Sequence, residues 1–407
     1  MKLAHILTIN SGSSSLKFSL YRMGESESLM FGGKIERIGL SPSLFHVKDV
    51  EGKTVIDRQS DLPDQEASLK LLFDWLDHHA PMKDLEAVGH RIVHGGTKFR
   101  EPHLVTKEVI QTLKDLSPMD PTHLYSEFEA IEAVGRLYPA LKQVACFGTA
   151  FHRHMPEVAQ RYGLPRRLGD EGVIRYGFHG LSYEYIMHEL REKEGRKSAD
   201  GKVIIAHLGN GASMAAVLRG KSVDTTMGFT PTSGFVMGTR SGDLDPEVIL
   251  FLLRIKKMTV AEVNDLVNLH SGLLGVSGIS SDMKDLLNKE KEDNHAAEAV
   301  SLFCYQAKKS LGGLVAALGG LDTLIFTGGI GENSPSIRRR ICEGMEIFGL
   351  SLDQDLNNAN AAIASPRDSP VTVRVMKTNE ELMIARHTYN IICNGPLKPK
   401  TGKAARD

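Results

Sequence analysis

Two arginines and a histidine stand beside glycines in a setting that suits chemistry on an anion. Arg91 and Arg240 each lie in a glycine-rich stretch, and His179 directly precedes Gly180. A guanidinium group can hold a phosphoryl group or a carboxylate with two parallel hydrogen bonds, and its charge does not titrate away. A structural salt bridge for each arginine and a buried carbonyl contact for the histidine are the alternative interpretations. The residue pattern leaves both open.

Short glycine turns follow several predicted strands, at residues 10–14, 95–96, 209–211 and 328–331. In open α/β sheets, ligands collect at the carboxyl ends of strands, where small residues let backbone amides approach a phosphate. A single turn of this kind is usually ordinary turn chemistry. Four of them interleaved with His and Arg favour a nucleotide site, and the turn over 328–334, which ends at a predicted helix, suits it best.

The commonest phosphate-binding loop, GxxxxGK[ST], is absent. The two Gly-Lys-Ser/Thr triplets begin at Gly52 and Gly220, and the positions five residues earlier are Val47 and Ala215. Neither triplet therefore completes the loop that wraps phosphates with backbone N–H groups. Any nucleotide must be bound in another way.

The elements that must position these residues come in two similar sets. Apolar runs at 3–9 and 16–21 flank the turn at 10–14, and runs at 203–206 and 214–218 flank the turn at 207–211. Each set predicts a hairpin with a polar tip. The spacing of about 200 residues is too long for a solenoid and favours two duplicated domains that face a cleft.

The remaining periodicity alternates between helix and strand, which predicts an α/β fold. The predicted helices cover 66–79, 105–115, 123–137, 246–256, 260–269 and 294–319, with further helices beginning near Ser334 and Asn379. The predicted strands lie at 86–93, 321–326 and 371–376.

Length and charge narrow the class of protein. A chain of 407 residues predicts two or three domains. With 49 basic and 50 acidic residues and a net charge of -1, no global field attracts nucleic acid or a membrane surface. The four cysteines are far apart and have no metal-ligand spacing, and the N-terminus resembles neither a signal peptide nor a membrane span. We expect a cytoplasmic protein without nucleic-acid or membrane partners.

Taken in order, the motifs resemble those of the acetate kinase family. The matching stretches are residues 10–17, 175–180, 207–213, 224–246 and 378–382. The resemblance covers the whole chain and implies duplicated ribonuclease-H-like domains of the actin, acetate kinase and hexokinase type around an interdomain cleft. We place an N-terminal domain at 1–148, joined by a C-terminal helix at 385–407, and a nucleotide-binding domain at 149–384.

The resemblance also implies an activity: reversible, ATP-dependent phosphorylation of a short-chain carboxylate to an acyl phosphate by direct in-line transfer, in a homodimer with Mg²⁺ or Mn²⁺. Arg91 would bind the carboxylate or acyl phosphate, while His179 and Arg240 would stabilise the transferring phosphoryl group. Asn10 and Glu380 would hold the metal ion. The implied wall of the acyl pocket is Val93, Phe178 and Pro231. The implied contacts to ATP or ADP are Lys17, His207, Leu208, Gly209, Asn210, Gly211, Asp282, Met283, Lys284, Gly329, Ile330, Gly331, Glu332 and Asn333.

Two departures from the family pattern bear on metal and acid. Gly148 stands where the family has a catalytic aspartate, and the segment 118–121 is one residue shorter than its counterpart and has no histidine. We expect altered metal handling at Gly148, with Asp120 as one candidate substitute. Acetate is the expected acid. Propionate or another short acid is one alternative, and a low-activity nucleotide-binding paralogue that acts as a sensor is another.

Overall fold

The computed structural model describes residues 2–79, 84–117 and 124–395. The chain divides into two units. Unit 1 comprises residues 1–150 and 380–407, and unit 2 comprises residues 151–379. The boundaries drawn from the sequence, 148 and 384, differ from these by a few residues.

The described part of unit 1 is built on a sheet with the strand order β5-β4-β3-β2-β1-β6-β8-β7. The hairpin expected at the N-terminus is present, with β1 and β2 antiparallel and Asn10 opposite Lys17. Strands β1, β6 and β8 run parallel to one another. The strands are β1 Ala4–Gly12, β2 Ser15–Met23, β3 Ser28–Glu36, β4 Ser43–Asp49, β5 Thr54–Ser60, β6 Leu85–Ile92, β7 His103–Leu104 and β8 Lys142–Phe147.

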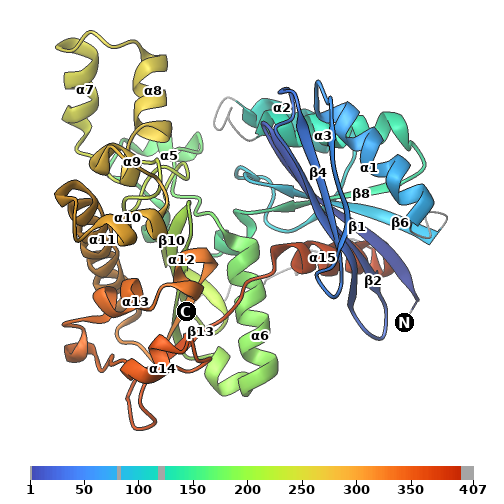
Figure 1. Cartoon of the computed structure of the whole chain (residues 1–407). Helices are drawn as coiled ribbons and strands as arrows, with labels where there is room; N and C mark the ends of the chain where they lie inside the picture. The colour runs from blue at the N-terminus through green and yellow to red at the C-terminus, as the bar shows by residue number, and fades with distance from the viewer. Residues whose placement is uncertain (1, 80–83, 118–123, 396–407) are drawn as a thin grey trace. The chain divides into compact units, whose positions relative to one another are not determined.

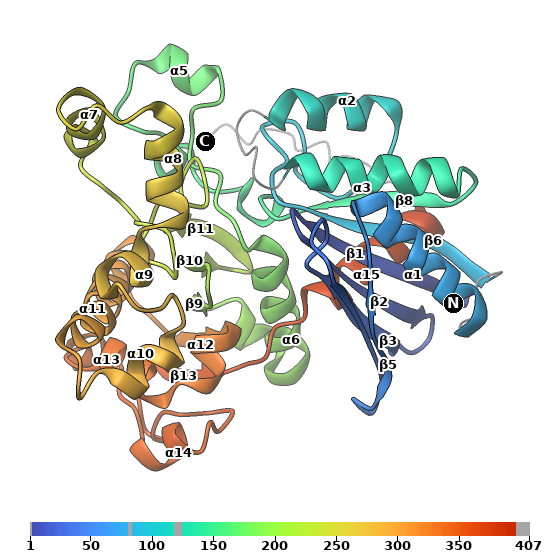
Figure 2. The same cartoon turned by 45° about the horizontal axis from the view of Figure 1, so that its top comes forward.

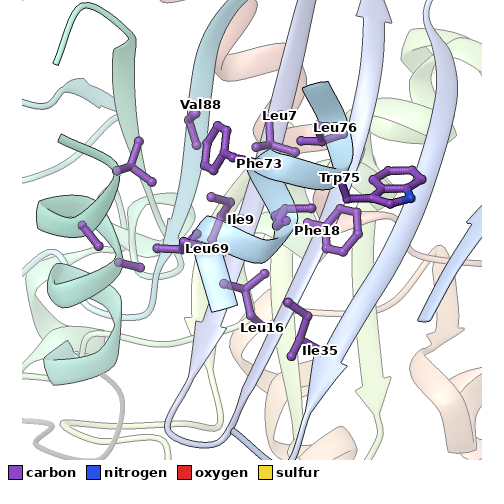
Figure 3. Close-up of a cluster of buried hydrophobic side chains, with 14 of the residues drawn as sticks. Leu7, Ile9, Leu16, Phe18, Ile35, Leu69, Phe73, Trp75, Leu76 and Val88 are labelled. Carbon is purple, nitrogen blue, oxygen red and sulfur yellow. The ribbon is translucent and has the colours of Figure 1, made fainter. Parts of the chain in front are cut away.

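Helices cover the sheet of unit 1 on both faces. The helices are α1 Gln65–His79, α2 Lys107–Leu116, α3 Leu124–Leu137 and α15 Glu380–Asn394. Figure 3 shows that Leu69, Phe73 and Leu76 of α1 pack on the sheet residues Leu7 and Phe18. All five side chains are buried. Burying such side chains is the main favourable contribution to folding.

The last helix, α15, packs on the other face of this sheet (Figure 1). Gly89 of β6 makes the close approach possible, because a side-chain carbon there would lie 2.3 Å from Thr388 Oγ1 and 2.6 Å from Ile384 Cγ2. No other residue type fits at that distance. The end of the chain therefore supports the strands that begin it.

Unit 2 repeats the plan with a sheet of order β11-β10-β9-β12-β13. The second predicted hairpin is formed by β9 and β10, and β9, β12 and β13 are parallel. The order β3-β2-β1-β6-β8 within unit 1 follows the same pattern. The strands are β9 Lys202–Leu208, β10 Ala212–Leu218, β11 Lys221–Thr225, β12 Thr323–Thr327 and β13 Thr372–Val375.

The sheet of unit 2 lies between α6 and α11. Side chains of α6 such as Tyr183 and Leu190 pack on Val203 and Ile205, and α11 contacts β9, β10 and β11. Helices α7 and α8 lie at one end of this unit, apart from its sheet (Figures 1 and 2). The helices are α4 Glu157–Gln160, α5 Arg166–Asp170, α6 Gly180–Ala199, α7 Pro246–Arg254, α8 Val260–Leu269, α9 Gly272–Ser277, α10 Met283–Lys289, α11 Asn294–Leu318, α12 Gly328–Asn333, α13 Pro335–Cys342 and α14 Gln354–Asn358.

The shared strand order confirms the predicted duplicated α/β fold. The predicted turn at 328–334 is different in detail, because residues 328–333 form the short helix α12 directly after β12. Among the described residues, no helix combines the length and the apolar character that crossing a membrane would require.

Candidate functional site

In unit 1, the parallel strands bring three of the predicted positions to one edge of the sheet. Ile9 of β1 lies opposite His90 of β6, so the next residues, Asn10 and Arg91, lie near the ends of neighbouring strands at the same level. Gly148 directly follows β8, whose last residue lies opposite Ile92. Ligand sites of open α/β sheets form at this carboxyl edge.

Arg91 is held at this edge by two carboxylates. Its Nε donates to Glu380 Oε2 at 3.2 Å, and its Nη1 lies 3.8 Å from Glu127 Oε1. Burial opposes the charged guanidinium, but attraction from Glu380 and Glu127 outweighs it and raises the pKa of Arg91. The arginine is therefore charged at every accessible pH, and its plane is fixed.

Glu127 is a site residue that the sequence reasoning did not find. It lies on α3 and is only 2% exposed. Its Oε2 accepts the backbone N–H of Val93 at 2.9 Å, while its Oε1 faces Arg91. A glutamate on the buried face of a predicted helix was the available signal, since a buried charge needs a partner.

Lys17 and Glu381 lie in the same unit and line a hollow of about 320 Å³. Burial raises the pKa of the Glu381 carboxyl group, the charge of Glu380 adds to this, and Lys17 and Arg91 act in the opposite direction. The edge of this sheet thus concentrates charges of both signs.

Asn10 and Glu380 can contribute oxygen ligands to a divalent ion. Glu380 Oε2 accepts a hydrogen bond from Arg91, and the strand register places Asn10 at the level of Arg91. Mg²⁺ usually takes one or two protein oxygens and completes its shell with water and substrate phosphates. No cluster of three or more His, Cys, Asp or Glu suited to a metal occurs in the described residues. The oxygen donors of Asn10 and Glu380 fit a hard divalent ion such as Mg²⁺.

The backbone at Gly148 is tightly placed. Its N–H donates to Ile92 O at 2.7 Å, and a side-chain carbon there would lie 3.1 Å from Val93 O. A larger residue at 148 therefore requires a shift of a few tenths of an ångström. Asp120, the candidate substitute carboxylate, lies outside the described residues.

In unit 2, His179 occupies a strained position at the start of α6. It has φ 59° and ψ 20°, in the left-handed region that few residues other than glycine adopt. Such strain is concentrated at functional sites. Its Nδ1 is 2.8 Å from Ser213 Oγ, and its ring stacks on that of His207 with centroids 4.3 Å apart.

His179 and Arg240 converge on the hairpin tip at Gly211. A side-chain carbon at Gly211 would lie 3.3 Å from Arg240 Nη1 and 3.4 Å from His179 Nε2. Arg240 is held in place by a bond from Nη1 to Pro231 O at 3.2 Å. Two potential donors therefore lie close to the same side of Gly211, where a methyl group would crowd both of them.

A cavity of about 710 Å³ lies in unit 2 next to the same hairpin. Its volume is within the range of small-molecule and cofactor sites. Eight predicted nucleotide contacts line it: Gly209, Asn210, Asp282, Met283, Lys284, Gly329, Ile330 and Asn333. Ser281, Leu287 and Ser334 also line it and were not predicted.

The other residues expected at the nucleotide do not line this cavity. Lys17 belongs to unit 1, and Leu208 is fully buried in the sheet. The Nδ1 of His207 is 2.8 Å from Ser182 Oγ. Glu332 turns back, and its Oε1 accepts the backbone N–H groups of Gly328 at 3.0 Å and Thr378 at 3.3 Å. Gly331 is likewise buried against the sheet.

Helix α12, which borders the cavity, is anchored by a buried arginine that the sequence reasoning also missed. Arg338 Nη1 donates to Gly331 O at 2.8 Å, and Nε and Nη2 bind Asn357. Burial lowers the pKa of Arg338 to about 10. A cation at the end of a helix where carbonyls are exposed is favourable, so Arg338 fixes the element that presents Gly329 to the cavity.

A duplicated sheet with a nucleotide-sized cavity and converging Arg and His groups defines a nucleotide-dependent phosphotransferase. The family model described as the Acetokinase family matches residues 5–386. The chain belongs to this family and is a kinase whose acceptor is a carboxyl group.

Relatives and solved structures agree along the whole length. The chain is 48% identical to an acetate kinase of Rhodopseudomonas palustris (strain TIE-1), over 96% of this chain and 99% of that protein. It is 42% identical to an acetate kinase of Bacillus subtilis (strain 168), over 96% and 100%.

Two crystal structures have similar folds. The Porphyromonas gingivalis acetate kinase has a TM-score of 0.88 at 37% identity, covering 96% of this chain and 100% of that one. A propionate kinase from Francisella tularensis has a TM-score of 0.89 at 34% identity, covering 94% and 98%.

Proposed function

We propose that this protein transfers the γ-phosphoryl group of ATP to acetate, reversibly and by direct in-line transfer with Mg²⁺. The observation that carries the proposal is that His179 Nε2 and Arg240 Nη1 lie on the same side of Gly211, in the hairpin tip whose residues Gly209 and Asn210 line a cavity of about 710 Å³. Curated relatives at 40–48% identity bear the name acetate kinase, which supports acetate as the acid.

The reaction does not need a general base to activate the acid. A carboxylic acid in water has a pKa of about 4, so acetate is already an anion at neutral pH and can attack phosphorus directly. Phosphoryl transfer instead requires alignment and neutralisation of the charge on the equatorial oxygens. Fixed positive charge and N–H donors supply both.

Each predicted residue then has a role that its surroundings support. The nucleotide occupies the cavity lined by Gly209 and Gly329, with backbone N–H groups near its phosphates. Arg240 and His179 bind the transferring phosphoryl group. Arg91, oriented by Glu380 and Glu127, binds the carboxylate or acyl phosphate.

The metal and the acyl group complete the assignment. Asn10 and Glu380 provide oxygen ligands for Mg²⁺, which neutralises phosphate charge when it is bound. The residues assigned to the acyl group are Val93 and Phe178, each buried within its own unit, and Pro231, whose carbonyl oxygen accepts from Arg240. Gly148, in place of a carboxylate, weakens the hold on the metal.

A substrate panel tests this function. The purified protein is incubated with ATP, Mg²⁺ and hydroxylamine, and acyl hydroxamate is measured for formate, acetate, propionate and butyrate. We expect the highest kcat/KM with acetate. A preference for propionate would overturn the choice of acid, whereas nucleotide binding without hydroxamate from any acid would overturn the kinase activity.

We also propose that the protein is a cytoplasmic homodimer. Helix α7 has no buried residue, and Val248 and Phe251 of α7, Ile255 directly after it and Val260 of α8 are at least 41% exposed. A second copy of the chain would cover such an apolar surface. A monomeric mass in light scattering would refute the dimer.

The proposed cytoplasmic location is supported by the four cysteines, which form no disulfide, as suits a reducing compartment.

A further inference from the structure

Three hydrogen-bonded side chains connect the core of unit 2 with the candidate site. The hydroxyl group of Tyr183 on α6 is hydrogen-bonded to Ser213 Oγ on β10. The same oxygen is 2.8 Å from His179 Nδ1. Tyr183 and Ser213 are fully buried, and His179 is not. The chain therefore connects the interior with the ring that faces Gly211.

The direction of these hydrogen bonds decides where His179 carries its proton. If Tyr183 donates to Ser213 and Ser213 donates to Nδ1, the proton of the neutral imidazole lies on Nε2. If Nδ1 donates to Ser213 instead, Nε2 presents a lone pair. The second nitrogen of a histidine is set in this way by the partner of the first.

The surroundings of Nε2 select the first direction. Nε2 and the Nη1 group of Arg240 lie on the same side of Gly211, 3.4 Å and 3.3 Å from where a side-chain carbon there would be. Arg240 offers only donors there, so the ligand that fits is an acceptor such as a phosphoryl oxygen. A lone pair on Nε2 would repel that oxygen, whereas an N–H would bind it.

We propose that Tyr183 and Ser213 are positioning residues that hold the neutral His179 ring in the Nε2–H tautomer and so aim an N–H donor at the transferring phosphoryl group. The proposal rests on the assignment of His179 made above. It adds a specific role for two fully buried hydroxyl groups.

The neutrality of this chain has a chemical consequence. In a serine hydrolase, a carboxylate binds the histidine Nδ1–H and stabilises the imidazolium that forms. Hydroxyl groups carry no charge, so the arrangement here favours a neutral ring that only donates. Arg240 then supplies the fixed positive charge, and His179 supplies a hydrogen-bond donor with a fixed orientation.

Other groups around the ring are compatible with this arrangement. His207 stacks on His179 with an interplanar angle of 19°, and its own Nδ1 is bound to Ser182 Oγ. His152 packs edge-on against Tyr183 with centroids 5.6 Å apart. These contacts fix the planes of the rings, and they are compatible with the hydrogen bond between Ser213 Oγ and His179 Nδ1.

The test combines a direct view of the proton with kinetics. Tyr183→Phe removes one hydroxyl group, Ser213→Ala removes the middle of the chain, and His179→Gln identifies the His179 signals. Tyr389→Phe is the matched control, because it removes a tyrosine hydroxyl bound to the carbonyl of Lys2 in unit 1. The tautomer of His179 is read from ¹⁵N chemical shifts of histidine-labelled full-length protein. The kcat and the KM for ATP are measured with acetate.

We expect a protonated Nε2 in the parent protein and in Tyr389→Phe. In Tyr183→Phe, the shifts move towards a mixture of tautomers, and kcat falls roughly 10-fold with little change in KM, because a misdirected donor costs part of the ~10²- to 10³-fold that one donor contributes. In the Ser213→Ala background, Tyr183→Phe has no further effect, since the two hydroxyl groups act in series.

Unchanged shifts and kcat in Tyr183→Phe would overturn the proposal, and that single variant decides the matter even if Ser213→Ala does not fold. Additive losses in the double variant would also overturn it. If the tautomer changes but kcat does not, the relay exists and the assignment of His179 to the phosphoryl group is what fails.

Discussion

The two units share a strand order but present different chemistry at the carboxyl ends of their parallel strands. In unit 1 this edge carries the charged side chains Arg91 and Glu380, supported by Glu127. In unit 2 it carries the glycine-rich hairpin tip at 209–211 and the start of helix α12, from which Gly209 and Gly329 line the cavity. One topology thus presents charged side chains in unit 1 and glycine backbone in unit 2.

This difference shows what topology decides and what it leaves open. The order of the strands fixes where a ligand can lie, since backbone groups at strand ends face the same edge. Side chains decide which ligand binds there. Charges suit a carboxylate and a metal ion, and bare backbone suits phosphates.

Removing the positive charge of Arg91 in unit 1 should have the largest effect on activity. We expect Arg91→Ala to lower kcat/KM for acyl phosphate formation by about 10³-fold, because arginines directed at a transferring group contribute ~10³ or more. It also leaves the buried Glu127 short of a cation, which costs about 3 kcal/mol of stability. The measurements are hydroxamate kinetics and urea unfolding.

Arg386→Ala is the matched control for Arg91→Ala. Arg386 also lies in unit 1, and it pairs with Glu27 at 2.7 Å instead of with the site. This variant should keep full activity. Unchanged acyl phosphate formation in Arg91→Ala would mean that the site has been placed wrongly.

Each unit contains a buried histidine that should make folding sensitive to acid. Burial lowers the pKa of His90 in unit 1 and of His152 in unit 2 to about 4. Between about pH 6.5 and 4 the unfolded chain binds more protons than the folded one, so stability falls as pH falls through this window. The loss approaches about 3 kcal/mol per histidine.

The change in unfolding free energy between about pH 7 and pH 4.5 measures this effect. His90→Gln keeps a side chain that can bind Gln143, the present partner of His90 Nε2 at 2.8 Å. We expect this variant to lose part of the pH dependence. An identical pH profile would show that the buried ring does not resist protonation.

Adding a methyl group at Gly211 in unit 2 should lower the rate moderately. Gly211→Ala places a methyl group 3.3 Å from Arg240 Nη1 and 3.4 Å from His179 Nε2. We expect kcat to fall about 30-fold, since displacement of reacting groups by about an ångström can cost ~10²-fold. Gly312→Ala on α11, where a side-chain carbon meets nothing within 4 Å, is the control and should stay active. Equal activities would remove Gly211 from the site.

The smallest expected change concerns the metal in unit 1. Gly148→Asp introduces a carboxylate at the sheet edge and should lower the Mg²⁺ concentration for half-maximal rate, or raise turnover, by a few-fold. Its side-chain carbon would lie 3.1 Å from Val93 O, which is tight but not prohibitive. Gly148→Asn has the same size without the charge. If both variants behave alike, charge at 148 does not govern metal binding.

Much of the fold could be predicted from local patterns. The hairpins at 3–21 and 203–218 and the helices α1, α3 and α8 were predicted closely. Their apolar residues recur with the period of one strand or helix face, and this signal is local. The family motifs then identified the fold and the class of reaction.

Other elements gave a weaker signal and were missed. Strand β5 is mostly exposed, so it has little apolar alternation, and β3 contains Gly32 and Gly33. Helix α6 begins at the strained His179 and is interrupted at Gly195, with φ 80° and ψ 176°. Such segments adopt their structure because neighbours support them, which a local pattern cannot reveal.

By itself, the sequence determined the alternation of elements, the duplication and the residue types available for phosphoryl transfer. Only the tertiary structure decided that Glu127 would orient Arg91, that Arg338 would anchor α12 and that Tyr183 would reach His179 through Ser213. In each case the partners come from different strands and helices. Distances between side chains depend on how strands pair and helices pack, and that is settled only when the whole core forms.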